Sequence, residues 1–407
     1  MLKSLTPSRL ILLFSGTVAV LALMGIWKIP QHQVEPIQNQ IKALKKLPDA
    51  DPKEIATLEK SKLDAENAAR TVLVQGAGGL FAAAAAYIAW RNLKATQEKQ
   101  VAERFSKAVE QLGNDNIHVR LGGIYALEQI AKDAEEKYYW QVMETLTSYI
   151  RVASPITEET KLVENDIQEA VRVLARRKYT YGHPLEPDRL NLCKTNLHGL
   201  QLFPNSKLQG MDLTETNLQN AKLSQVNLQE AKLDDAKMQR VLLLEANMDK
   251  AQLKGAKLRD AKLFKTILSS AHLAAAELQN AYLEEANLKK AVLIKAELGK
   301  ANLKKANLEE ANLWGANMLG AQLNKANLKR TRFKENHPNL GKMLGKQAAI
   351  NLTWEQIKQA KAYTKELLPD YLLKELAESE AQECAASTQK SAESSRDEGE
   401  SAPHQED

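Results

Sequence analysis

Between residues 190 and 333 a leucine, or another large apolar residue, returns at every fifth position. The unbroken run opens at Leu208 and closes at Phe333, which makes about 26 consecutive repeats in one register. A small residue, mostly alanine, stands two positions before each leucine, and a polar residue such as Asn227 or Asn307 stands between them. The unit reads A-[N/K/E]-L-x-x. Its period fits neither the 3.6 residues of a helical turn nor a sustained strand alternation.

Within one unit the alanine and the leucine are two positions apart, so they share one face of an extended segment while the polar residue between them faces outward. The two remaining residues turn the chain. Self-similarity at a fixed period predicts a solenoid, in which each unit packs only on its neighbours. The pattern therefore predicts a β-helix with flat sides, one pentapeptide to a side.

This run resembles the pentapeptide-repeat family, whose A-[D/N]-L-x-x motif winds a right-handed, four-sided β-helix. The resemblance covers about a third of the chain. It implies four repeats in each coil and about seven coils stacked ~4.8 Å apart. Leucines would stack on leucines inside, each contributing about 1.5–3 kcal/mol relative to an exposed side chain.

Stacking with four repeats to a coil predicts which outward side chains become neighbours. Three columns follow: Glu245, Lys265, Glu285, Lys305; Lys250, Ser270, Lys290, Glu310, Arg330; and Asp249, Ser269, Lys289, Glu309, Lys329. A second face would carry an asparagine ladder of Asn227, Asn247, Asn287, Asn307 and Asn327. Opposite charges on neighbouring strands stabilise by ~0.2–1 kcal/mol per pair. These columns are either a patterned binding face or a solvated wall that satisfies itself.

Two uncharged stretches precede the repeats. Residues 10–27 are long enough to suggest a membrane anchor, with a cleaved signal peptide as the alternative. Residues 71–90 are rich in alanine and contain Gly76, Gly78 and Gly79, a small-residue face that lets another helix approach closely. A buried soluble helix is the alternative there. Residues 1–91 are thus predicted to form an anchor of two transmembrane helices joined by a helical hairpin over 28–70.

Lysine and arginine near the span ends predict the orientation. Lys3 and Arg9 precede the first span, and Arg91 and Lys94 follow the second, whereas the loop between them mixes both signs of charge. The positive-inside rule then places both termini in the cytoplasm. This predicts an integral protein of the bacterial inner membrane or the thylakoid.

Residues 92–180 carry apolar stripes at helical spacing and predict an α-helical adaptor. The stripes are Val101, Phe105, Ala108, Val109, Leu112; Leu121, Ile124, Leu127, Ile130; Tyr139, Val142, Met143, Leu146, Tyr149, Ile150; and Val163, Ile167, Ala170, Val171, Leu174. The stretch VRLGGIYALEQIA (119–131) is similar to the V-R-x-x-A-x-x-A-L-x-x-I pattern of HEAT-like repeats. It also resembles a segment that precedes the pentapeptides in bacterial, especially cyanobacterial, membrane-attached members of that family. Gly122 and Gly123 replace the alanine typical of HEAT and predict close helix contact.

Both ends of the repeat run are irregular. Leu208 follows Leu202 by six residues, which predicts a bulge or protruding corner at Phe203-Pro204-Asn205. After Phe333, the region 334–377 is expected to cap the open end of the solenoid with a helix over 353–377, kinked or divided at Pro369. Residues 378–407 are polar and are expected to be disordered.

Composition and charge narrow the function. The net charge is +5, and the two cysteines, Cys193 and Cys384, lie far apart, which favours reduced thiols in the cytoplasm. Seven histidines show no metal-binding spacing, and no P-loop or G-x-S-x-G motif occurs. We therefore expect no catalytic, cofactor-binding or metal-binding residues and no enzyme activity.

A scaffold function fits these features best. Residues 190–333 hold about 22 Lys and Arg against 14 Asp and Glu, the wrong sign for the acidic rod with which some members of the family mimic DNA and bind topoisomerases. The expectation is a non-enzymatic, membrane-anchored scaffold that presents the rod for protein–protein interaction. The alternatives are a topoisomerase-directed DNA mimic, and a module that binds nucleic acid or the anionic membrane surface.

Overall fold

The computed structural model describes residues 32, 34–49, 51–157, 161–334 and 351–382. The chain divides into two units, Met1–Gln100 and Val101–Asp407. The boundary falls inside a helix and not at residue 91, where the composition changes. The first stretch predicted to span a membrane, residues 10–27, lies outside the described residues.

The first unit contains a helix over 34–44 and most of the long helix α2, Pro52–Leu112. Val34 and Ile41 of the shorter helix are buried. Lys45 pairs with Glu59 at 2.7 Å, which holds the segment after the first helix against α2. The carboxylate of Asp51 accepts a hydrogen bond from the backbone N–H of Lys53 and so caps the start of α2.

Helix α2 is 61 residues long and contains the second predicted span, 71–90, with no break on either side. No proline occurs between Lys53 and Gly113, and the residues after Trp90 are mostly strong helix formers. The predicted span and the amphipathic stripe around Phe105 therefore form one helix. Within the described residues α2 alone is long and apolar enough to cross a membrane, and none of its most apolar window is buried.

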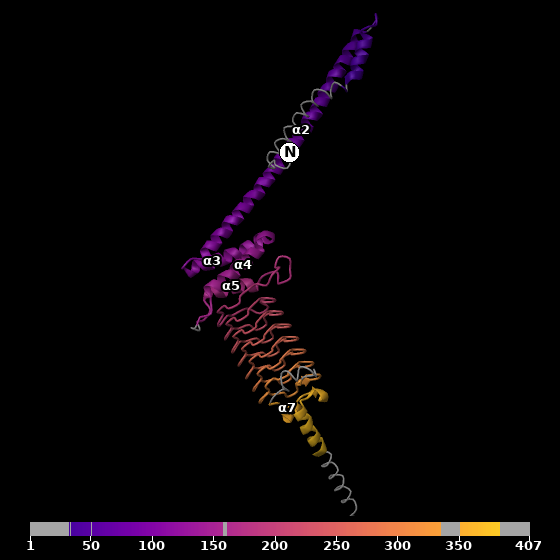
Figure 1. Ribbon diagram of the computed structural model, residues 1–407. Helices are drawn as coiled ribbons and strands as arrows, with labels where there is room; N and C mark the ends of the chain where they lie inside the picture. Colours follow the sequence, from indigo (N-terminus) through magenta and orange to yellow (C-terminus); the bar gives the residue numbers. More distant parts are fainter. Residues whose placement is uncertain (1–31, 33, 50, 158–160, 335–350, 383–407) are drawn as a thin grey trace, which may run out of the picture. The chain divides into compact units, whose positions relative to one another are not determined.

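The second unit opens with a helical bundle made of the end of α2, α3 (Ile117–Asp133), α4 (Glu135–Ala153) and α5 (Asn165–Ala175) (Figure 1). The predicted apolar stripes face its interior: Ile124, Leu127, Ile130, Leu146, Ile150, Ala170, Val171 and Leu174 are fully buried. Asn116 caps α3, because its side chain accepts a hydrogen bond from the N–H of His118. The apolar core continues from this bundle into the repeats without interruption.

Gly123 lies where α3 contacts the end of α2. A Cβ on Gly123 would stand 2.8 Å from the carbonyl oxygen of Ala108, whereas a Cβ on Gly122 would meet nothing within 4 Å. We expect Gly123→Ala to lower the free energy of unfolding of the second unit by about 1–3 kcal/mol, because the two backbones must separate. The matched control Gly122→Ala should be neutral or stabilise by up to about 1 kcal/mol. Urea unfolding followed by circular dichroism measures both, and equal losses would contradict the close contact.

The repeats wind into a stack of coils (Figure 1). Parallel backbone bridges join each coil to the next, and from Lys207 onward the paired residues are 20 apart, as in Asn287↔Asn307 and Asn312↔Arg332. In this register Leu288 lies over Leu308, and both are fully buried. The predicted β-helix with four pentapeptides in each coil is confirmed.

A tight turn ends each pentapeptide. The third residue of the four-residue turn has a positive φ, such as 57° at Glu245 and 54° at Lys265. The small residue that follows it closes the turn, as when Ala246 N–H donates to Leu243 O at 3.1 Å. A positive φ at only the second central residue identifies a type II turn. Most of these positions carry charged or polar residues instead of glycine, so each turn retains about 1–2 kcal/mol of backbone strain, which coil stacking offsets.

The first coil is longer by one residue. The bridges Asn191↔Asp212 and Gln201↔Lys222 join residues 21 apart. The extra residue forms the projecting corner expected from the sequence: Phe203 is 62% exposed, and the guanidinium of Arg172 lies 4.8 Å from the centre of its ring.

The segment after the repeats covers the open end of the last coil, but it is not the predicted helix over 353–377. It consists of α7 (Trp354–Lys358), β2 (Ala362–Tyr363), the 3-10 helix η2 (Lys365–Leu367) and a helix over 370–382. Strand β2 pairs in parallel with β1 (Asn327–Leu328) of the last coil. The reason is that an open coil edge presents unpaired backbone N–H and C=O groups, which an extended segment satisfies and a helix does not.

The last helix also changes the boundary of the tail. Residues 378–382, expected to be disordered, are helical. Pro369 directly precedes this helix, a position that proline tolerates because the first N–H groups of a helix have no partner inside it. The remainder of the predicted disordered tail, 383–407, lies outside the described residues.

Candidate binding surface

Charged columns run along the sides of the coil stack, as the sequence predicts. Glu285 lies between Lys265 and Lys305, with N–O distances of 3.7 and 2.9 Å. The hydrogen bond from the Lys305 ammonium holds the pKa of the Glu285 carboxyl below its usual range. The other columns contain Lys250–Glu230, Lys289–Glu309, Lys290–Glu310 and Arg330–Glu310 pairs. These columns largely satisfy themselves.

The asparagine ladder is also present. The side-chain amide of Asn307 donates to Asn287 at 3.3 Å, and that of Asn327 donates to Asn307 at 3.0 Å. The Oδ1 atom of Asn307 also accepts the backbone N–H of Glu309 and so fixes its own turn. Ile267, which is 40% exposed, interrupts the ladder. This wall has few unsatisfied polar groups to offer a partner.

Two adjoining faces in the first half of the stack lack this pairing. Six basic side chains gather there, and we call them the cationic patch: Lys222, Lys237, Arg240, Lys257, Arg259 and Lys262. Lys237 and Lys257 are direct bridge partners, and Lys222 and Lys262 flank Leu242 in the same column. No ion pair involves any of the six within the described part of the chain.

Apolar side chains border the cationic patch. Leu244 is 37% exposed and Tyr282 is 47% exposed. The ammonium of Lys262 lies 3.1 Å from the centre of the Tyr282 ring, a cation–π contact. The patch therefore offers both charge and apolar area. The sequence contains a signal for the patch, because Lys237 and Lys257 are 20 residues apart and therefore fall in one column, but this column lacks the alternation of sign that marks the columns predicted above.

The helical bundle closes the N-terminal end of the stack. Carbonyl oxygens of Ser154 and Ala175 accept the N–H groups of Asn196 and Lys207, at 2.8 and 2.6 Å. These bonds satisfy the edge that the first coil would otherwise expose. The adaptor predicted from the sequence is thus also the N-terminal cap of the repeats.

A buried ion pair lies at this junction. The guanidinium of Arg177 donates to the Glu186 carboxylate at 3.0 and 3.1 Å, and both side chains are fully buried. Arg177 also donates to the carbonyl oxygens of Lys207 and Gln209, in the first full coil. Tyr139 donates its hydroxyl to Glu186 at 3.1 Å, and burial beside this carboxylate raises the pKa of Tyr139. The sequence shows Arg177 only as one of three consecutive basic residues, 176–178, with nothing to mark it as the buried one.

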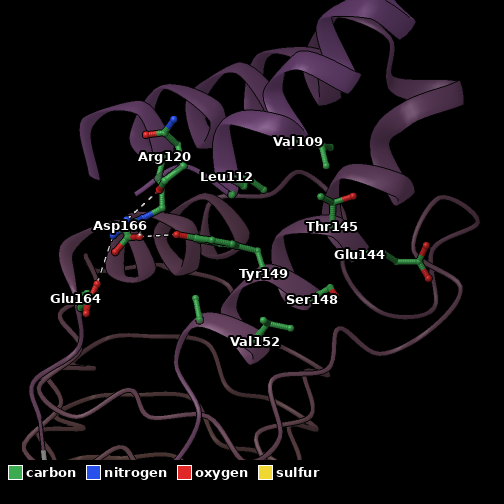
Figure 2. A pocket seen from close by; sticks show the side chains of 13 residues that line it. Val109, Leu112, Arg120, Glu144, Thr145, Ser148, Tyr149, Val152, Glu164 and Asp166 are labelled. Atoms are coloured by element: carbon green, nitrogen blue, oxygen red, sulfur yellow. Dashed lines mark hydrogen bonds and ion pairs between the residues drawn. The ribbon is translucent and has the colours of Figure 1, made fainter. Parts of the chain in front are cut away.

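A groove of about 790 Å³ lies on the helical bundle, between the end of α2, α3, α4 and the start of α5 (Figure 2). Arg120 Nε donates to the Asp166 carboxylate at 2.6 Å, and the hydroxyl of Tyr149 donates to the same oxygen. Arg120 also donates to the backbone carbonyls of Asn114 and Asp115. The network ties α3, α4 and α5 together through the Oδ2 atom of Asp166, whereas the buried Oδ1 atom of Asp166 has no hydrogen-bond partner in the described structure.

The Asp166 network predicts a pH-dependent stability. Burial tends to raise the pKa of Asp166, but the hydrogen bonds from Tyr149 and Arg120 outweigh it and hold the pKa below its ordinary value. A depressed folded-state pKa contributes stability above the unfolded-state value of about 3.9, and that contribution is lost as the pH falls through the folded-state pKa.

We expect Tyr149→Phe to lower the free energy of unfolding by about 1.5–3 kcal/mol at neutral pH, since a hydrogen bond to a charged group is lost. The difference from the unmodified protein should shrink below about pH 4, where the unfolded carboxyl is protonated. Urea titrations at neutral and acid pH measure both values. A pH-independent difference would show that the hydroxyl does not act through the carboxylate.

Few of the described residues could bind a metal ion or react as a thiol. Among the described residues no three His, Cys, Asp or Glu side chains are grouped so that they could hold a metal ion. Cys193 is a free, half-buried thiol, and Cys384 lies outside the described residues.

The matches to known proteins fall in the repeats. A family model described as pentapeptide repeats matches residues 201–229, 227–263, 266–304 and 301–335. No curated protein matches the chain. Matches to solved structures also cover about a third of the chain or less.

Three of these structures illustrate the range. QnrB1, a plasmid-mediated fluoroquinolone resistance protein, is 22% identical over 32% of this chain and 68% of its own, with a TM-score of 0.30. The second structure is HetL, a pentapeptide repeat protein involved in heterocyst differentiation regulation from the cyanobacterium Nostoc sp. strain PCC 7120. It is 26% identical, and the match covers 33% of this chain and 84% of HetL, with a TM-score of 0.19. Another pentapeptide repeat protein from Nostoc PCC 7120 is 36% identical, and the match covers 23% of this chain and 78% of that protein, with a TM-score of 0.13.

The assignment rests on the family model and on the coil itself, since the TM-scores are too low to carry an argument from shape. The matched residues and the 20-residue bridges cover the same part of the chain. Residues 201–335 of this protein belong to the pentapeptide-repeat family.

Proposed function

We propose that this protein is a non-enzymatic, membrane-anchored scaffold that presents the sides of its repeat stack to a protein partner. The observation that carries the proposal is that both ends of the stack are covered. The helical bundle bonds to the first coil, and the segment 351–376 bonds to the last, as where Lys361 N–H donates to Ala326 O at 2.7 Å. A partner therefore has the long lateral surface to contact.

Membrane attachment is supported by the apolar part of α2, residues 71–90, and by the uncharged stretch 10–27. Arg91, Lys94 and Lys99 directly follow the second stretch. Under the positive-inside rule these charges favour repeats on the cytoplasmic side of a bacterial inner membrane or a thylakoid.

A topoisomerase-directed DNA mimic is the alternative that the resemblance to the pentapeptide-repeat family implies. Such a mimic has to present phosphate-like negative charge along the rod. Here cations exceed acids in the repeats, and six of the cations form the cationic patch. The charge therefore favours a scaffold for another kind of partner.

Crosslinking and capture from native membranes test the proposal. The intact protein should fractionate with membranes and bring down a defined set of proteins, and a variant lacking residues 190–333 should lose that set. A second variant lacking only residues 292–311, one complete coil outside the cationic patch, keeps both covered ends and should retain that set, so it controls for surfaces that the large deletion uncovers. Soluble fractionation of the intact protein would contradict the anchor, and an unchanged set of partners without the repeats would contradict the scaffold function.

A further inference from the structure

We propose that the cationic patch docks an acidic, extended segment of a partner protein, with Leu244 and Tyr282 contacting apolar side chains of that segment. The inference rests on the proposed scaffold function and names the face and the chemistry of the partner. Its basis is the contrast between this patch and the rest of the stack.

Like charges are neighbours in the patch. Lys237 and Lys257 are bridge partners on strands ~4.8 Å apart, and like charges directly opposite each other are destabilising. Ion pairs elsewhere on the stack join cations to glutamates of the next coil, as at Lys305 and Glu285, whereas Lys257 forms no ion pair with Glu277, its bridge partner in the next coil. A partner that brings carboxylates would relieve the repulsion in the patch.

The acid nearest the corner of the patch is already engaged. Asp260 accepts a hydrogen bond from the side-chain amide of Asn280 at 3.1 Å and forms no ion pair with Arg240 or Arg259 in the described structure. The six cations are half-buried or exposed. Their charges are therefore accessible, and none of the six is held in an ion pair within the described structure.

Side chains and not the backbone would hold the partner. The strands beneath the patch use their backbone groups for coil stacking: Leu223 N–H donates to Leu242 O at 2.7 Å, and Lys262 N–H donates to Val241 O at 2.9 Å. Addition of a strand to a sheet edge is therefore not open here. Specificity would come from carboxylates placed against the cations and from apolar groups placed against Leu244 and Tyr282.

The shape of the patch favours a protein segment over a membrane or a nucleic acid. The cations lie on two faces that meet at the turn containing Arg240, so a flat lipid surface could contact only part of them. On one of these faces Glu277 and Glu297 follow Lys257 in the next two coils, and they would repel an extended row of phosphates. The patch spans about three coils, ~10–15 Å, the length of three to four extended residues.

Fluorescence anisotropy with the intact protein in detergent tests the inference. The probe is a labelled peptide of alternating Glu and Leu, and a Gln and Leu peptide of the same length is its control. We expect saturable binding that weakens with salt. The double variant Lys237→Glu/Lys257→Glu should weaken binding by at least about tenfold, because it reverses two charges at the site.

A matched variant separates the patch from general charge. Lys300→Glu/Lys304→Glu makes the same change in net charge at exposed or half-buried cations elsewhere on the stack, and it should alter affinity less than about twofold. Equal loss in both variants would overturn the inference, as would absence of peptide binding. Tighter binding to phosphatidylglycerol vesicles or to duplex DNA than to the peptide would assign the patch to a phosphate surface and also overturn it. Failure here leaves the membrane capture result standing, so the two proposals fail separately.

Discussion

Deleting residues 247–266, one complete coil, should leave a folded and cooperative protein, although it removes seven inward-facing apolar residues, four of them large. The cut joins Ala246 to Ile267, which restores an Ala-x-Leu unit ending at Leu268. Coils are joined by bridges between residues 20 apart, so every later coil still meets a matching neighbour. In a solenoid, stability is roughly a sum over neighbouring units. The loss should therefore be limited to the contribution of one coil.

Deleting only Lys289 and Lys290 should be far more damaging, although neither residue is buried. Five residues are needed to cross one side and turn the corner, and a three-residue side cannot span the coil at ~3.3–3.6 Å per residue. An extra residue is tolerated, as at Phe203, because it can project outward. We expect a loss of at least about 3 kcal/mol, from several coil-to-coil hydrogen bonds worth about 0.5–1.5 kcal/mol each. Urea unfolding of both variants measures this, and a two-residue deletion that proves the milder would contradict the coil geometry.

Replacing Arg177 by alanine should destabilise the second unit by about 3–5 kcal/mol, because it leaves the buried Glu186 carboxylate without its partner. The same change frees the carbonyl oxygens of Lys207 and Gln209, so the bundle should loosen from the first coils. Hydrogen exchange at the amides of residues 190–210 should increase more than exchange near Leu308.

Two further variants control this result. Lys178→Ala removes an exposed pair with Glu135 and should destabilise the protein far less than Arg177→Ala, since solvent screens such pairs. The double variant Arg177→Met/Glu186→Leu should recover much of the loss, since buried pairs can often be replaced by apolar residues of similar size. If Arg177→Ala is no worse than Lys178→Ala, the ion pair does not secure the junction.

The features that the sequence predicts well are those that repeat. A period of five places leucine inside and charge outside, and a coil of four units then makes residues such as Lys265 and Glu285 neighbours. The helical stripes are predicted for the same reason, because apolar spacing at 3.6 residues is local. The projecting corner at Phe203 follows directly from one additional residue in that register.

The features that the sequence does not predict depend on contacts that occur once in the fold, between segments distant in sequence. Arg177 is one of three basic residues at the end of α5, and only the path of the first coil makes it the buried one. The cap after residue 350 is extended at β2 because the backbone of the last coil needs hydrogen-bond partners. The sequence of the cap alone does not show this requirement. Helix α2 continues past Trp90 because no proline or other helix-breaking residue follows, although its composition changes there.

One measurement tests the stacked coil most directly. Spin labels at Gln225 and Lys325, with Cys193 and Cys384 replaced by serine, lie in one column, five coils apart. Double electron–electron resonance should give a narrow distribution centred near ~24 Å, five spacings of ~4.8 Å, although 100 residues separate the labels. A broad distribution, or a mean distance beyond about 35 Å, would contradict the coil and with it the lateral surface on which the proposed function depends.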